Sequence, residues 1–158
     1  MTRDWIDEGL RHLRERQEAE HLASTRRHHH TAVIKDQGPE LMKRLVAEVG
    51  ASVEEYNQKA GDVIDFQALP RGGFYVTKAT FPSVSLECHP DYEAHVLYCN
   101  MTRTDTQESD PQELAFNLDL IVDDAGTIGL RYQDCAFQTL DKVVEHLVKP
   151  VLFPLVSE

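Results

Sequence analysis

The sequence predicts an α+β fold with two N-terminal helices, a six-stranded antiparallel meander sheet and a C-terminal helix packed on one face. Apolar residues recur at helical spacing before residue 61 and after residue 139, and at every second position between them. All 158 residues are expected to form a single domain. Its parts are an N-terminal helical arm at 1–37, a second helix at 38–61, the sheet at 62–133, and a C-terminal helix and tail at 134–158.

The first helix is predicted at residues 3–30, which contain no proline and many residues of high helix propensity. Its apolar stripe is short and consists of Ile6, Leu10 and Leu13. A long helix that is otherwise polar needs a partner surface, which favours an oligomer formed through this helix. Gly38 and Pro39 are expected to end the helical arm, because proline disrupts a helix interior and suits the first turn of the next helix.

The second helix is predicted at residues 40–60, where apolar side chains recur every four positions. Gly61 follows the last of them, in the place of a left-handed cap. The C-terminal helix has the apolar stripe Leu140, Val143, Val144, Leu147 and Val148. Thr139 is expected to cap this helix, and Pro150 and Pro154 are expected to end it or to break the apolar tail.

Six strands are predicted between the helices, separated by short turns that favour antiparallel neighbours. They lie at 63–69, 74–80, 83–89, 93–102, 114–122 and 127–132. The last hairpin has the best-determined register, because two independent patterns agree. Pairing Leu120 with Leu130 makes one face apolar, and the same register places Asp119 opposite Arg131.

The chain is acidic, with a net charge of −11, which disfavours nucleic acid as a partner. The charge is unevenly spread: residues 1–35 carry seven basic and six acidic side chains, and residues 36–158 carry nine and 21. Such an asymmetry occurs in arms that dock electrostatically onto their own body or onto a second copy. The simpler interpretation, which the sequence favours, is a solvated helix with Glu–Arg pairs along it. The sequence has no stretch that could span a membrane, and its three cysteines lack a disulfide pattern, so we expect a cytoplasmic protein.

The segment at 88–99 holds two cysteines and two histidines, which are ligand types that zinc accepts. We predict a hairpin in which His89 pairs with Ala94, so that Cys88 faces His95 and Cys99 lies about 13 Å further along the strand. That geometry excludes a zinc site. It leaves Cys88 and His95 as candidate catalytic residues, against the simpler interpretation that Cys88 is a small buried hydrophobic side chain.

His21 and His28 are candidate metal ligands, because residues seven apart share a helix face. They supply at most half of a site, which a second copy would have to complete. The sequence contains no phosphate-binding loop, dinucleotide fingerprint or zinc-protease motif, so no cofactor is expected.

The favoured function is a non-enzymatic protein-interaction or chaperone-like module that forms a homo-oligomer through helix 3–30. One alternative is a domain that binds a small apolar ligand between the sheet and the C-terminal helix. Its predicted pocket residues are Val84, Leu86, Leu97, Met101, Leu140 and Val144. The other alternative is an enzyme that uses Cys88 and His95.

Overall fold

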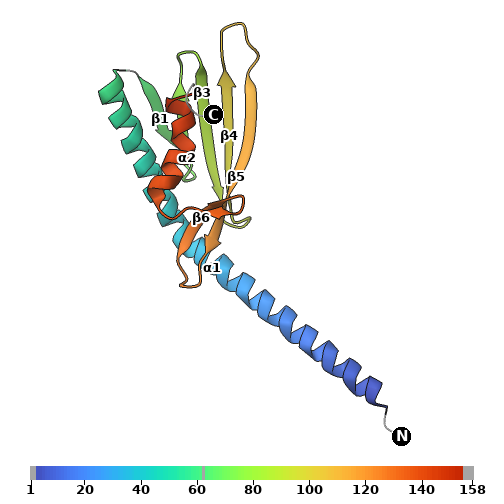
Figure 1. Ribbon diagram of the computed structural model, residues 1–158. Coiled ribbons are helices and arrows are strands. Elements are labelled where there is room, and N and C mark those ends of the chain that lie inside the picture. The colour runs from blue at the N-terminus through green and yellow to red at the C-terminus, as the bar shows by residue number, and fades with distance from the viewer. Residues whose placement is uncertain (1–2, 62, 155–158) are drawn as a thin grey trace.

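A computed structural model, which describes residues 3–61 and 63–154, shows one antiparallel sheet with two helices on one of its faces (Figure 1). Helix α1 spans Asp4–Ala60 and helix α2 spans Leu140–Leu152. The strands are β1 Ile64–Ala68, β2 Phe74–Lys78, β3 Ser83–Asp91, β4 Val96–Thr104, β5 Gln112–Val122, β6 Ile128–Tyr132 and β7 Cys135–Ala136. They follow one another across the sheet in chain order.

This arrangement confirms the α+β class, with an antiparallel sheet between a helical N-terminal part and a C-terminal helix. The sheet has seven strands instead of the predicted six. The extra strand, β7, is a two-residue segment that folds back onto β6, with Tyr132 opposite Cys135. A strand of two residues is too short to show an alternating pattern, which explains why the sequence did not reveal it.

Helix α1 runs without interruption through Gly38 and Pro39, so the prediction of two separate helices is wrong. A proline inside a helix removes one hydrogen bond and costs about 3 kcal/mol. On this helix, however, Ile34 before the proline and Leu41 and Leu45 after it are buried in the same core. Packing on both sides of Pro39 therefore keeps the helix continuous. The helix ends as predicted, with Gly61 in the left-handed conformation at φ 68°.

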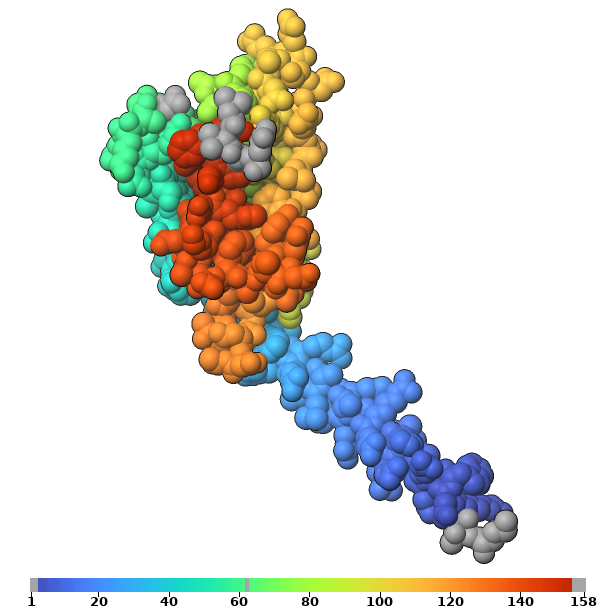
Figure 2. Space-filling model, in the orientation of Figure 1, coloured from blue at the N-terminus to red at the C-terminus, as the bar shows by residue number. Residues whose placement is uncertain are grey.

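The turn between β3 and β4 contacts α1 where the helix extends beyond the body of the protein, by which we mean the sheet with α2 and the second half of α1. Gly38 lies so close to the ring of Tyr92 that a Cβ atom on the glycine would be 2.6 Å from Cδ1. Two polar contacts on this segment are Thr31 Oγ1 to His95 Nε2 at 3.0 Å and Lys35 Nζ to Glu93 Oε1 at 3.6 Å. The part of α1 before Thr31 passes the β5–β6 turn at Arg26, His29 and His30 and then projects away from the sheet as a separate rod (Figures 1 and 2).

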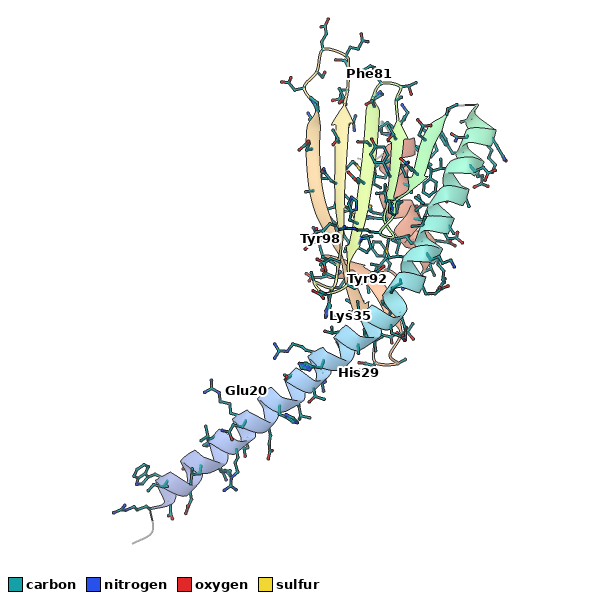
Figure 3. The ribbon with its side chains drawn as sticks, turned by 180° about the vertical axis from the view of Figure 1, so that it is seen from behind. Glu20, His29, Lys35, Phe81, Tyr92 and Tyr98 are labelled. Atoms are coloured by element: carbon teal, nitrogen blue, oxygen red, sulfur yellow. The ribbon has the colours of Figure 1, made fainter. Side chains whose placement is uncertain are left out.

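The core lies between the two helices and the inner face of the sheet. Its fully buried side chains come from every layer, and the largest are Phe74, Ile34, Met42, Leu45, Leu86, Leu97, Leu118 and Leu147. The outer face of the sheet carries mainly polar side chains and is covered by no helix of the described chain (Figure 3). An antiparallel sheet tolerates this arrangement, because only one of its faces has to be apolar.

The predicted register of the β5–β6 hairpin is confirmed, with Leu120 opposite Leu130 and Asp119 opposite Arg131. The guanidinium Nη2 of Arg131 is 3.2 Å from Oδ2 of Asp119. The predicted cap of α2 is confirmed too, since the Thr139 hydroxyl accepts a hydrogen bond from the backbone N–H of Lys142 at 3.4 Å.

Pro150 does not end α2, which continues to Leu152. Val151 after the proline is fully buried, so burial again favours continuing the helix across a proline. The helix stops two residues before Pro154, as the conformational restriction on the residue preceding a proline predicts.

Substituting Gly38 by alanine should lower the free energy of unfolding by about 1–3 kcal/mol, because the new methyl group would have to displace the Tyr92 ring. Gly9→Ala is the matched control: it is also a helical glycine, and a Cβ there has no neighbour within 4 Å. It should leave stability unchanged or raise it by up to about 1 kcal/mol. Urea unfolding of both variants measures the difference, and equal stabilisation by the two would contradict the close contact.

Candidate functional site

The two candidate catalytic residues are not brought together. Cys88 on β3 lies opposite Cys99 on β4, with 3.4 Å between the two sulfur atoms. His95 lies in the turn, with φ 58°, and its side chain contacts Thr31 of α1. The predicted pairing of Cys88 with His95 is therefore wrong.

The error arises from the position of the turn. His89 pairs with Tyr98 instead of Ala94, because β3 continues through Pro90 to Asp91 before the chain reverses. The carboxylate of Asp91 accepts hydrogen bonds from the backbone N–H groups of Glu93 and Ala94, which fixes the turn after Asp91. The shift moves each partner by four residues. An even shift leaves every side chain on its predicted face.

Cys88 is fully buried, and burial raises its pKa well above the ordinary value of 9.0. The neighbouring Cys99 thiol and the charge of Glu87 raise it further. A thiol held in the protonated form is a poor nucleophile. Cys99 is also buried, and Cys135 on β7 is the exposed cysteine. The structure thus places Cys88 and Cys99 in the packed core, where the two thiols contact each other.

The candidate metal ligands His21 and His28 both lie on the projecting part of α1, where their side chains are exposed. Within residues 3–61 and 63–154, no group of three or more His, Cys, Asp or Glu side chains is placed to hold a metal ion. Completion of this site by a second copy stays a prediction.

The predicted pocket residues divide into three groups. Leu86 and Leu97 are packed in the core with no exposed surface. Leu140 and Val144 lie on α2, half-buried and buried respectively. Val84 and Met101 line a pocket of about 400 Å³ between α2 and the inner face of β3, β4 and β5. We call this space the α2 pocket. Val144 lines a separate surface depression between α1 and α2.

The α2 pocket has an apolar floor and a polar rim. Its apolar lining consists of Val84, Met101, Leu114, Phe116 and Pro150. Its polar lining consists of Arg103, Gln112, Glu113, Tyr132 and His146. The Arg103 guanidinium contacts Asp105 at 2.6 Å through Nε and donates to the backbone oxygen of Pro154 at 3.0 Å through Nη1. The end of α2 is thereby joined to the sheet at the rim.

His146 forms the aromatic wall of the pocket together with Phe116 and Tyr132. Its ring centre is 4.7 Å from that of Tyr132 and 6.2 Å from that of Phe116. Phe137 contacts the same histidine from the segment before α2, at 5.4 Å. Burial among these rings lowers the pKa of His146 from its usual value of 6.5, so the imidazole is neutral at pH 7.

The sequence analysis missed His146, Tyr132 and Phe116 as a group. The available signal was the placement of His146 directly before Leu147 of the apolar stripe of α2, on the side that faces the sheet. Tyr132 and Phe116 alternate correctly with the apolar face of their strands. Their convergence on one histidine depends on where α2 crosses the sheet, which no local pattern specifies.

Comparison with protein-family models, with curated proteins and with solved structures finds no match to this chain. None of the helices in the described part of the chain is long and apolar enough to cross a membrane.

Iodoacetamide should label the folded protein at Cys135 alone, because that thiol is exposed and the other two are buried. Mass spectrometry should find one carbamidomethyl group per chain before unfolding and three in denaturant. Rapid labelling of Cys88 in the folded protein would show that its thiol is accessible and would reopen a role in catalysis.

His146 should make folding less favourable in mild acid. Because its pKa is lowered in the folded protein, the unfolded chain binds a proton that the folded chain does not as the pH falls through about 6.5. Stability is therefore lost with falling pH, down to the lowered pKa. Thermal unfolding from pH 7.5 to 5 should show a steeper loss for the wild type than for His146→Gln, and parallel curves would contradict the prediction.

Proposed function

We infer that this protein acts without catalysis, through protein contacts, and that it forms a homo-oligomer through the projecting part of α1. The observation that carries this proposal is the exposure of residues 4–30, which extend about 40 Å as a helix with water around them. In a monomer, the greater part of this helix, before Arg26, has no packing against the sheet or α2.

The apolar side chains of the arm support the proposal. Trp5 is 74% exposed, and Leu10 and Leu13 are about half exposed on the predicted stripe. Helices in water gain most of their stability from tertiary packing of an apolar face, and isolated ones are marginal. Packing the stripe against a second copy would remove these side chains from water and stabilise the helix at the same time.

Ion pairs along the arm account for part of its stability but not for its apolar stripe. Nε of Arg11 lies 4.0 Å from Oε1 of Glu15, and Nε of Arg16 lies 3.5 Å from Oε1 of Glu20. The two residues of each pair are one helical turn apart. Such exposed pairs contribute only about 0.3–0.5 kcal/mol each. A helix of this length therefore gains more from a partner surface than from its own charges.

The charge asymmetry is consistent with docking between arm and body. At the base of the arm, Arg26, His29 and His30 line one surface depression together with Asp123 and Asp124 of the β5–β6 turn. Basic and acidic side chains thus lie around the same depression within one chain. The part of α1 before Arg26 extends away from the acidic remainder of the chain (Figure 2). Its charged side chains are there accessible to the acidic surface of a second copy.

The proposal predicts a particle mass that is a multiple of 18.0 kDa at tens of micromolar protein. The double substitution Leu10→Asp with Leu13→Asp should shift the protein to the monomer, because it places two charges on the stripe. Leu22→Asp is the matched control: Leu22 is 65% exposed and lies about 180° around the helix from Leu13. Light scattering after size-exclusion chromatography measures all three proteins.

A monomeric wild type in this experiment would refute the proposed oligomer. Equal dissociation by the stripe variant and by Leu22→Asp would show that the stripe is not the contact. Circular dichroism on each variant checks that the sheet remains folded, which is expected because all three leucines are exposed in the isolated chain.

A further inference from the structure

We propose that the α2 pocket binds a small, uncharged aromatic molecule. This inference does not depend on the oligomer, because the pocket lies between α2 and the sheet and not on the arm. Its volume of about 400 Å³ falls in the range of small-molecule sites. Such sites combine a mainly apolar lining with a few polar groups, and this pocket has both.

The floor of the pocket is apolar and accessible. Leu114 is 60% exposed, although its strand position places it on the inner face of the sheet. Met101 pairs with it across β4 and β5 and is half-buried. An apolar ligand on this floor would remove both side chains from water, which provides the driving force for binding.

The wall of the pocket favours an aromatic ligand. The rings of Phe116 and Tyr132 stand edge to face, with centres 5.9 Å apart, and His146 contacts both. Aromatic rings gain about 0.5–1.5 kcal/mol per pair beyond area burial when they meet at such angles. A flat ring entering from the open side would extend the same arrangement.

The charges around the pocket disfavour an anion. Arg103 is the cationic side chain of the lining, and its guanidinium is already bonded to Asp105 and to the Pro154 carbonyl. Residues 36–158 also carry a large acidic excess. His146 offers no compensating positive charge at pH 7, because burial keeps the imidazole neutral. Repulsion by this field selects against a carboxylate ligand.

The rim supplies hydrogen-bonding groups for one polar substituent. The Gln112 amide has both donors and an acceptor, and the Tyr132 hydroxyl is able to do either. A neutral amide or alcohol on an aromatic ring therefore fits the chemistry of the pocket, whereas a charged group does not.

A matched pair of aromatic probes tests the preference of the pocket for an uncharged ligand. 1-Naphthamide and 1-naphthoate share the ring system and differ in carrying a neutral amide or a carboxylate. Calorimetric titration of the full chain at pH 7.5 should show one saturable site per chain for the amide. The carboxylate should bind at least about tenfold more weakly.

A matched pair of variants tests the location. Leu114→Asp places a charge on the floor and should weaken amide binding at least about tenfold. Leu22→Asp makes the same substitution at a leucine of similar exposure on the arm and should leave the affinity unchanged. Both sites are exposed, so neither variant is expected to unfold the chain.

Three outcomes would overturn the inference. One is the absence of saturable amide binding, and another is the absence of a difference in affinity within either matched pair, the two probes or the two variants. The third is binding of the amide only after the oligomer is dissociated, which would identify the pocket as an interface between copies.

Discussion

The inner face of the sheet is the constraint on which the other features depend. Most side chains from β2 to β6 that point to this face are apolar, and Lys78, Arg103 and Gln112 near the strand ends are the polar ones. The opposite face is polar, so the sheet needs to be covered on one side only. The second half of α1 and the whole of α2 supply the cover and contact each other as well as the strands. Each fully buried aliphatic side chain contributes about 1.5–3 kcal/mol, so the core outweighs a local defect such as Pro39.

The arm follows from the same constraint. An α-helix is stiff over a few turns, so the packing of Ile34 and Leu45 sets the direction in which α1 extends beyond the sheet. The β3–β4 turn adds a lateral contact at Gly38, where only a glycine lets the Tyr92 ring approach. Beyond that contact the helix continues in a set direction. Its apolar residues Leu10 and Leu13 are therefore exposed, far from the sheet.

Much of the fold could be predicted because local patterns report which face a residue occupies. The β5–β6 hairpin was predicted correctly because its apolar alternation and the Asp119–Arg131 pair require the same register. The β3–β4 hairpin has no such second pattern. Its turn depends on the side chain of Asp91, which starts the reversal later than Pro90 suggests. An even shift of register keeps each side chain on the same face of the sheet but changes the residue that lies opposite it on the neighbouring strand.

This distinction explains which parts of the candidate site could be predicted. The Cys88–His95 hypothesis required a particular partner across the hairpin, and it failed with the register. The placement of Val84 and Met101 beneath α2 required only the correct face, and both residues do line the α2 pocket. The convergence of Phe116, Tyr132 and His146 required the crossing point of α2 over the sheet, which depends on tertiary packing and leaves no periodic signal.

The α2 pocket itself follows from a mismatch of lengths. Helix α2 has 13 residues and is about 20 Å long, whereas the 11 residues of β5 extend about 37 Å. One helix of this length leaves part of the inner face uncovered, and Leu114 is exposed there. Arg103 holds the end of α2 at Pro154 and so sets the rim where the cover stops. The buried core does not include the exposed side chain of Leu114, so folding does not depend on covering this part of the sheet. For this reason, the pocket is able to bind a ligand without being required for folding.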